Sequence, residues 1–173
     1  MKNNVEKTNV MRILEQKKIP YTSYCYADTG VVSGIEVAAA LRQNPRQVFK
    51  TLVTISGSGH NYVFLTPVER ELDLKKAAKA VGEKNISMIK SKELLPLTGY
   101  IHGGCSPVGM KKAFQTVIDA SAQNFDTIIF SAGKIGYQVE TSLKELKKVL
   151  KFQLEDIVVG QKEYGKRFYL YCN

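Results

Sequence analysis

The chain has 173 residues, of which 44% are apolar, and its formal net charge is +9 at pH 7. This length suits one domain, expected to span 1–173, and no apolar run approaches the roughly 18 residues that cross a bilayer. The first ten residues lack the apolar stretch of a signal peptide, so we expect a cytoplasmic protein that does not bind membranes. The three cysteines have no CxxC spacing, which argues against a disulfide framework and a zinc cluster.

Helices and short strands alternate along the chain. The first half is predicted to hold a helix over 8–18, a strand over 21–26, a helix over 33–43, strands over 48–56 and 62–66, a helix over 72–81, a strand over 86–89 and a short helix from 91 that ends before Pro96. After a glycine-rich loop, the second half is predicted to hold strands over 116–119, 127–130 and 137–140, a helix over 142–150, and tail strands over 157–159 and 167–171. The irregular spacing predicts an α/β (α+β) domain with one mixed, curved sheet.

Local signals support several of these elements. Serine and glutamate three residues apart form capping boxes at Ser33 and Ser142, each at the start of a predicted helix. The segment 57–59, Gly-Ser-Gly, separates two strands and predicts a hairpin. Both of these strands are apolar on each face, so we expect them to lie centrally in a covered sheet.

The positive charge favours a polyanionic partner through long-range attraction and counterion release. A lysine-rich, solvated surface explains the same charge equally well. The basic residues are spread along the chain, and no arginine-rich tail is present. If nucleic acid binds, we therefore expect a folded surface with a shaped pocket.

Lys50 is unusual because it interrupts an apolar strand. A buried ammonium needs a partner or shifts its pKa, and at the mouth of a cavity it could bind an anionic or carbonyl group. Alternatively, the strand end is exposed and the side chain reaches water. The strand pattern alone leaves both interpretations open.

The segment Gly103–Gly109 carries three glycines and a proline within seven residues. Such a loop can point backbone amides at one oxygen, as in an oxyanion hole or a phosphate-binding nest, or it can be a tight structural turn. It matches neither the Walker pattern nor GxGxxG. Cys105 lies in this loop without an evident activating base, because His102 and His60 are the only histidines. We therefore expect Cys105 to be a packing residue.

A second glycine turn follows Ser131. In one interpretation this serine caps its own turn, and in the other its hydroxyl group donates a hydrogen bond to a substrate at a pocket rim. The two histidines and three cysteines show no spacing that would supply a metal site or a Ser-His-Asp triad. We expect neither a metal nor a cofactor.

Taken together, these segments resemble the YbaK/EbsC family of aminoacyl-tRNA deacylases, which is related to the editing domain of bacterial prolyl-tRNA synthetases. The resemblance covers about residues 8–155. It rests on the order and spacing of 48–52 (VFKTL), 66–67 with 72–76, 98–100 (TGY), 103–109 (GGCSPVG) with 111–112, 118–119 and 131–133 (SAG).

The resemblance implies a mixed sheet curled into a barrel-like shape with helices around it. It also implies cleavage of the ester between a wrong amino acid and tRNA, above all cysteine on proline tRNA. Mischarged tRNA would be the substrate, and prolyl-tRNA synthetase is a candidate partner. The residues that match family positions are Lys50 and Gly104 for catalysis, with the Gly104 amide facing the ester carbonyl, and Tyr26, Thr51, Gly103, Ser106, Pro107, Ser131 and Gln138 for substrate binding.

This chain departs from the family pattern at Gln138, where some members have an acidic residue that could serve as a base or pair with the substrate ammonium. Glu140 is retained two residues further on. Few of the candidate site residues could act as a general base that activates water. This fits the route implied for cysteine-specific members, in which the substrate thiol attacks its own ester. The alternatives are a water-using deacylase for another small amino acid, such as alanine, and a non-catalytic RNA-binding module.

Overall fold

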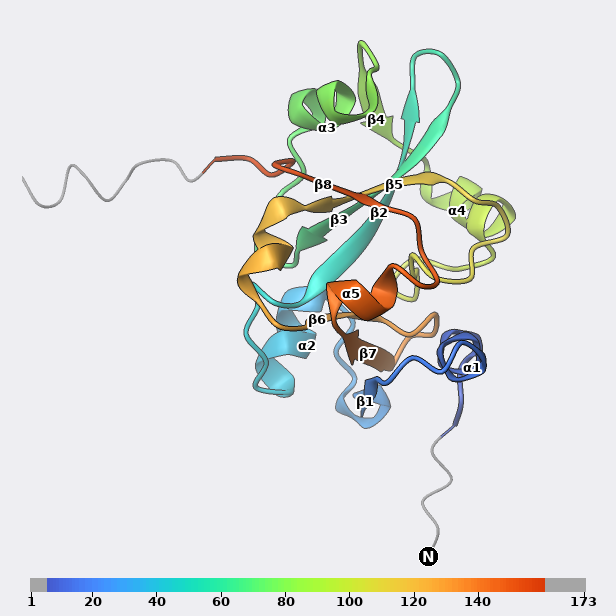
Figure 1. Ribbon diagram of the computed structural model, residues 1–173, viewed down its shortest axis with the longest axis vertical. Coiled ribbons are helices and arrows are strands. Elements are labelled where there is room, and N and C mark those ends of the chain that lie inside the picture. Colours follow the sequence, from blue (N-terminus) through green and yellow to red (C-terminus); the bar gives the residue numbers. More distant parts are fainter. Residues whose placement is uncertain (1–5, 161–173) are drawn as a thin grey trace, which may run out of the picture.

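The computed structural model describes residues 6–160, and its strands form two sheets (Figure 1). The larger sheet has the order β4 (Ile86–Met88), β2 (Phe49–Ser56), β3 (Asn61–Pro67), β5 (Gln115–Asp119) and β8 (Gln153–Glu155). The smaller sheet has the order β1 (Thr22–Cys25), β7 (Tyr137–Thr141) and β6 (Ile128–Ser131). An isolated parallel bridge between Val48 and Ile129 connects them. The mixed α/β fold is confirmed, but the strands form two sheets where one was expected.

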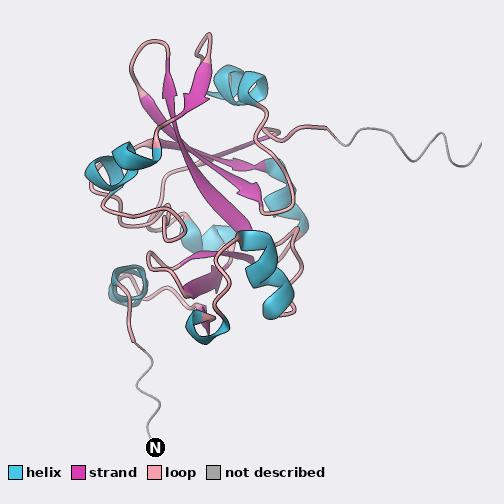
Figure 2. Cartoon of the chain, turned by 180° about the vertical axis from the view of Figure 1, so that it is seen from behind, coloured by secondary structure: helices cyan, strands magenta, loops and turns pink. Residues whose placement is uncertain are grey.

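Helices surround these sheets on the outside of the molecule (Figure 2). They are α1 (Asn9–Gln16), α2 (Gly34–Ala40), α3 (Leu74–Val81), α4 (Ser91–Thr98) and α5 (Leu143–Leu146), with 3-10 segments at Ala27–Thr29 and Ala120–Asn124. The predicted caps of α2 and α5 are confirmed, because the hydroxyls of Ser33 and Ser142 accept hydrogen bonds from the amides three residues on, at 3.3 and 3.1 Å. None of the helices in the described part of the chain is long and apolar enough to cross a membrane.

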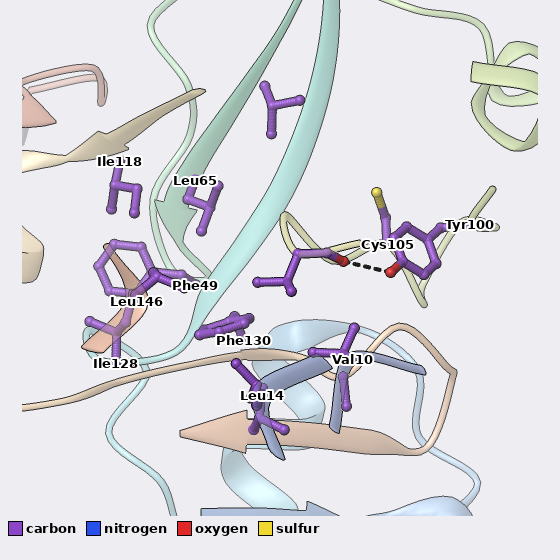
Figure 3. Close-up of a cluster of buried hydrophobic side chains, with 14 of the residues drawn as sticks. Val10, Leu14, Phe49, Leu65, Tyr100, Cys105, Ile118, Ile128, Phe130 and Leu146 are labelled. Atoms are coloured by element: carbon purple, nitrogen blue, oxygen red, sulfur yellow. Dashed lines mark hydrogen bonds between the residues drawn. The ribbon is translucent and has the colours of Figure 1, made fainter. Parts of the chain in front are cut away.

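The main core lies between the two sheets. Phe49 and Leu65 enter it from the larger sheet, Phe130 enters from the smaller one, and α1 contributes Leu14 (Figure 3). Val139 of β7 belongs to the same cluster. On its other side, the larger sheet packs against α3 through a second cluster around Phe64 and Ala77. The predicted hairpin of β2 and β3 is confirmed as antiparallel, and both strands lie inside the sheet. Their apolar character on both faces follows from this double coverage.

The helix α4 differs from the prediction that it would end before Pro96. It continues to Thr98 with Pro96 inside it. The missing amide of a proline would have bonded to the carbonyl four residues earlier. Pro96 is exposed, so water can hydrate that carbonyl. Gly99, with a φ of 83°, ends the helix, and its backbone N–H donates a hydrogen bond to the carbonyl of Leu95.

The C-terminal part also differs from the prediction. The helix α5 ends at Leu146, short of the predicted 150. The strand β8 pairs with β5 at Gln153–Glu155, whereas the predicted tail strand over 157–159 makes only an isolated bridge between Val158 and Leu72. The predicted strand over 167–171 lies outside the described residues.

The packing of the two sheets makes Phe130 a test of the core. Its side chain is fully buried between them, and replacing a buried phenylalanine with alanine leaves a cavity that costs about 3–5 kcal/mol. We expect Phe130→Ala to lower the free energy of unfolding by that amount in urea denaturation. Leu74→Ala, at a 41% exposed position, should change it by less than about 1 kcal/mol. Equal effects of the two substitutions would contradict this description of the core.

Candidate active site

A cavity of about 760 Å³ lies beside β2, at the junction of the two sheets. On the side of β2 away from β3, only Thr54–Ser56 pair with β4. Apart from the bridge of Val48 to β6, residues 50–52 therefore have no strand neighbour on that side among residues 6–160, and the cavity runs along this unpaired edge. A free strand edge offers unpaired backbone groups. The architecture thus leaves an opening with polar backbone at the place where the two sheets meet.

Six of the nine predicted site residues line this cavity. They come from distant parts of the chain: Tyr26, Lys50, Thr51, Gly103, Ser131 and Gln138. The remaining three, Gly104, Ser106 and Pro107, do not line it. The structure thus brings most of the predicted set together around one opening, and their roles toward a substrate stay predictions.

Lys50 is half-buried in the cavity wall, directly opposite Thr66 on β3. Burial lowers the pKa of its ammonium from the ordinary value, and the charge of Glu71 acts in the opposite direction. Its Nζ makes no hydrogen bond or ion pair with residues 6–160. A partly desolvated cation without a partner is poised to bind an anionic or carbonyl oxygen.

The hydroxyl of Thr51 lies next to Lys50 in the sequence and also lacks a partner. Its Oγ1 is buried and makes no hydrogen bond in the described part of the protein, and Thr51 lines the cavity. The Oγ1 of Thr66, opposite Lys50, is in the same condition. Buried polar atoms are nearly always hydrogen-bonded, so the unsatisfied hydroxyl of Thr51 in the cavity wall marks a place for a ligand or water, whereas Thr66 does not line the cavity.

The glycine loop begins with a tight turn over 101–104. The amide of Gly104 donates to the carbonyl of Ile101 at 3.0 Å, and Gly103 has a φ of 85°. A Cβ atom on Gly104 would lie 3.0 Å from the backbone nitrogen of Ile135. Gly104 therefore lets this loop pack against the second glycine turn. That amide already has an acceptor within the turn, and its role toward the ester stays a prediction.

The amides on either side of Gly104 are different. Neither Gly103 nor Cys105 has an acceptor for its backbone N–H among residues 6–160, and both residues line the cavity. Glycine loops that leave amides unpaired can bind an oxyanion. If the loop supplies such donors, these two amides are available, together with that of His102, which also lines the cavity and has no acceptor among residues 6–160.

Ser106 and Pro107 are buried and do not line the cavity, and their contact with substrate stays a prediction. The Oγ of Ser106 accepts a hydrogen bond from the amide of Val108 at 3.4 Å, and its side chain has no exposed surface. The loop is held inward here, since the hydroxyl of Tyr100 donates to the carbonyl of Val108 at 2.5 Å (dashed line in Figure 3). Both residues are therefore part of the loop's inner packing.

Cys105 also belongs to the packing of the core. It lies beside Tyr100 in the main cluster (Figure 3). Burial raises the pKa of its thiol to about 12, so at neutral pH the group is protonated and is a weak nucleophile. This agrees with the expectation that Cys105 packs and does not attack the substrate.

Ser131 and Gln138 face each other across the antiparallel pair β6 and β7. The Oγ of Ser131 accepts a hydrogen bond from the amide of Gly133 at 3.1 Å, so this serine caps its own turn and also lines the cavity. Gln138 is 5% exposed, and its Oε1 accepts a hydrogen bond from Nε2 of Gln43 at 2.8 Å. Tyr26, at the end of β1, is equally buried.

No carboxylate is among the described residues that line the cavity. Glu140, also on β7, instead accepts hydrogen bonds from Tyr24, from Thr127 at 2.6 Å and from Gln47 at 3.4 Å. It joins the three strands of the smaller sheet. Within residues 6–160, no group of three His, Cys, Asp or Glu side chains is placed to hold a metal ion.

Several residues at the cavity were not predicted from the sequence. Val32, Ile35 and Met88 are apolar, line the cavity and are each 46–49% exposed. His102 lines it as well. No signal in the sequence marks the apolar rim, because the start of α2 and the region around β4 are far apart in the chain. Gln43 was missed because its partner Gln138 is 95 residues away.

Comparison with known proteins identifies the family. The aminoacyl-tRNA editing domain matches residues 30–149. A relative from Enterococcus faecalis (strain ATCC 700802 / V583), named "Putative Cys-tRNA(Pro)/Cys-tRNA(Cys) deacylase EbsC", is 43% identical over 161 residues, which cover 92% of this chain and 98% of the relative.

Solved structures show the same fold. The crystal structure described as "a putative trans-editing enzyme for prolyl tRNA synthetase" superposes with a TM-score of 0.75 at 26% identity, covering 87% of this chain and 95% of that one. The crystal structure of hypothetical protein APE2540 has a TM-score of 0.77 at 20% identity, covering 89% and 100%. The match of the editing domain to 30–149, together with the relative that spans nearly the whole chain, shows that this protein belongs to the aminoacyl-tRNA editing domain family.

Proposed function

We propose that this protein is a trans-editing deacylase that cleaves the ester between cysteine and a mischarged tRNA, above all proline tRNA. One observation supports this most strongly: the half-buried, unpartnered ammonium of Lys50 faces a cavity with no carboxylate in its described walls. Such a site suits a ligand rich in oxygen acceptors. The names of the Enterococcus faecalis relative and of the trans-editing structure supply the substrate class.

Hydrogen-bond donors surround the place where an ester would sit. The ammonium of Lys50 binds an oxygen of the terminal nucleotide, and the amides of Gly103 and Cys105 stabilise the oxyanion that forms at the ester carbonyl. The Thr51 hydroxyl, which has no partner among residues 6–160, forms a hydrogen bond with a polar substrate atom. These groups orient and polarise the ester, and none of them needs to remove a proton.

The nucleophile in this proposal is the thiol of the substrate itself. Its sulfur attacks the ester carbonyl and forms a carbon–sulfur bond, and the carbon–oxygen bond to the ribose breaks. The thiol proton passes to the departing ribose oxygen, which leaves as a free hydroxyl. The cyclic thioester that is released then takes up water to give cysteine. The protonated state of Cys105 and the lack of a carboxylate among the described lining residues support this route over attack by an enzyme group.

The tRNA body would rest on the basic surface that the net charge of +9 provides. Prolyl-tRNA synthetase is the proposed partner, since it charges the tRNA that needs correction, and the trans-editing neighbour carries that enzyme in its name.

A second candidate is a water-using deacylase for another small amino acid, such as alanine. His102 supports it, because this histidine lines the cavity and could act as a general base for a water molecule. The thiol route leaves His102 without an essential role.

Lys50→Ala tests the role of the ammonium. We expect it to lower the rate of cysteinyl-tRNA deacylation by at least about a hundredfold, the loss typical of a charged group that binds the transition state. The control is Lys50→Met, which keeps the side chain's apolar volume and should have the same loss of activity. Because it removes a desolvated charge without a partner, its melting temperature should equal or exceed that of the wild type. Full activity in either variant would exclude the role given to Lys50.

The nature of the nucleophile is tested by changing the substrate. Serinyl-tRNA presents a hydroxyl in place of the thiol at nearly the same size, and the hydroxyl is far less nucleophilic at neutral pH. We expect its deacylation to be slower than that of cysteinyl-tRNA by at least about a hundredfold. His102→Gln should retain cysteinyl-tRNA activity within about threefold. Equal cleavage of both esters, with loss of activity in His102→Gln, would favour the water route.

A further inference from the structure

The hydrogen bond between Gln43 and Gln138 fixes which end of the Gln138 amide faces the cavity. The Oε1 of Gln138 accepts from Nε2 of Gln43 at 2.8 Å. The oxygen of Gln138 therefore faces α2, and its NH₂ group is the polar end left for the cavity that Gln138 lines. A carboxylate at this position would present an acceptor; Gln138 presents a donor.

Backbone geometry holds Gln43 in place. Its amide donates to the carbonyl of Ala38 at 2.8 Å, and the amide of Arg42 donates to that of Ala39 at 3.2 Å. This pair of bonds closes the end of α2 in the manner usually reserved for glycine. Arg42 adopts the left-handed conformation with a φ of 54°, which is unfavourable for a residue with a side chain. The turn thereby carries Gln43 toward β7.

The reverse orientation of the two amides is less favourable. The Oε1 of Gln43 is buried and has no partner among residues 6–160. If both amides were turned over, this buried position would hold the NH₂ group of Gln43, with two unpaired donors. Buried donors without acceptors are rarer in proteins than underused carbonyl oxygens. The geometry therefore favours the oxygen of Gln138 toward Gln43.

The charges in the cavity favour the same conclusion. Lys50 places a cation in the wall, and the carboxylate whose charge acts on it, Glu71, does not line the cavity. A substrate ammonium brought close to Lys50 and to the Gln138 NH₂ group would meet a like charge and a donor. Such contacts disfavour binding of the charged amine. An acceptor atom of the aminoacyl group, such as its sulfur or an ester oxygen, fits beside Gln138.

We propose that Gln43 is a positioning residue that turns the NH₂ group of Gln138 into the cavity, so that the site recognises an acceptor atom of the aminoacyl ester and does not require its α-ammonium. This inference rests on the proposed deacylase function. It assigns Gln138 a part in specificity that an acidic residue at the same position could not have.

The test compares two esters of the same tRNA: cysteinyl, and 3-mercaptopropionyl, which keeps the thiol but lacks the amine. For the wild type, we expect the KM values of the two esters to agree within about threefold. Gln138→Glu offers a carboxylate to the ammonium, so it should prefer the cysteinyl ester by about tenfold or more. The carboxylate of Gln43→Glu can only accept hydrogen bonds when it is ionised, so Gln138 must turn its NH₂ group toward it. The oxygen of Gln138 then faces the cavity and can accept from the substrate ammonium, so this variant should prefer the cysteinyl ester as well.

The role of Gln43 is separated from folding by a matched pair. Gln43→Leu removes the bond to Gln138, and we expect its KM to rise by about three- to tenfold for both esters with a smaller change in kcat. Gln47→Leu is the control, since Gln47 bonds to Thr127 and Glu140 and does not line the cavity. Its KM should stay at the wild-type value. The preference for the cysteinyl ester that we expect in Gln43→Glu is a gain in discrimination, so partial unfolding of the variant cannot produce it.

A wild type that requires the amine, with a KM at least about tenfold higher for the 3-mercaptopropionyl ester, would overturn this inference and leave the deacylase function intact. So would identical KM changes in Gln43→Leu and Gln47→Leu. A wild type that cleaves neither ester would overturn the proposed function itself, and the inference with it.

Discussion

The partly buried ammonium of Lys50 is the constraint around which the site is organised. A lysine in a strand costs stability when its charge is desolvated, and here residues 6–160 provide no partner for it. The strand β2 can hold it because its edge is unpaired at residues 50–52, where the two sheets part. The same gap that leaves Lys50 without a partner also creates the cavity. A ligand with an exposed oxygen can therefore accept the hydrogen bond that the Lys50 ammonium does not make within residues 6–160.

The glycine loops complete this arrangement by allowing close approach. The loop at Gly103 and the turn after Ser131 come from different parts of the chain, and they touch because Gly104 has no side chain to hold the backbone of Ile135 away. Their contact closes one wall of the cavity. The inner half of the first loop, including Ser106 and Cys105, packs into the core. Rigid packing behind the loop keeps the free amides of Gly103 and Cys105 in position.

Much of this was predictable from sequence because the signals were local. The caps at Ser33 and Ser142, the hairpin after residue 56 and the apolar strands around Lys50 each depend on residues close together in the chain. Periodicity could not connect Lys50 with Tyr26, Ser131 and Gln138, which lie far apart in the sequence. The resemblance to a known family connected them, and the fold places all four around one cavity.

The remaining features depend on contacts that no local pattern encodes. The hydrogen bond from the amide of Gly104 to Ile101 depends on how the turn over 101–104 folds, and the predicted role of this amide toward a substrate stays a prediction. Pro96 continues a helix because its side is exposed to water, and exposure is a tertiary property. The bond between Gln43 and Gln138 depends on a left-handed arginine and on the packing of α2 beside β7. The strands form two sheets, and not the single sheet expected from the sequence, because pairing between β2 and the smaller sheet is confined to the bridge at Val48.

Binding of a stable substrate analogue measures the role of Lys50 apart from any chemistry. The analogue is a tRNA 3′ end that carries cysteine through an amide, which the protein cannot readily cleave. Calorimetric titration should show binding to the wild type and an affinity at least about tenfold lower for Lys50→Met, the loss of a hydrogen bond to a charged group. Equal affinities for the two proteins would show that the unpartnered ammonium does not hold the substrate, and would contradict the assignment of this cavity.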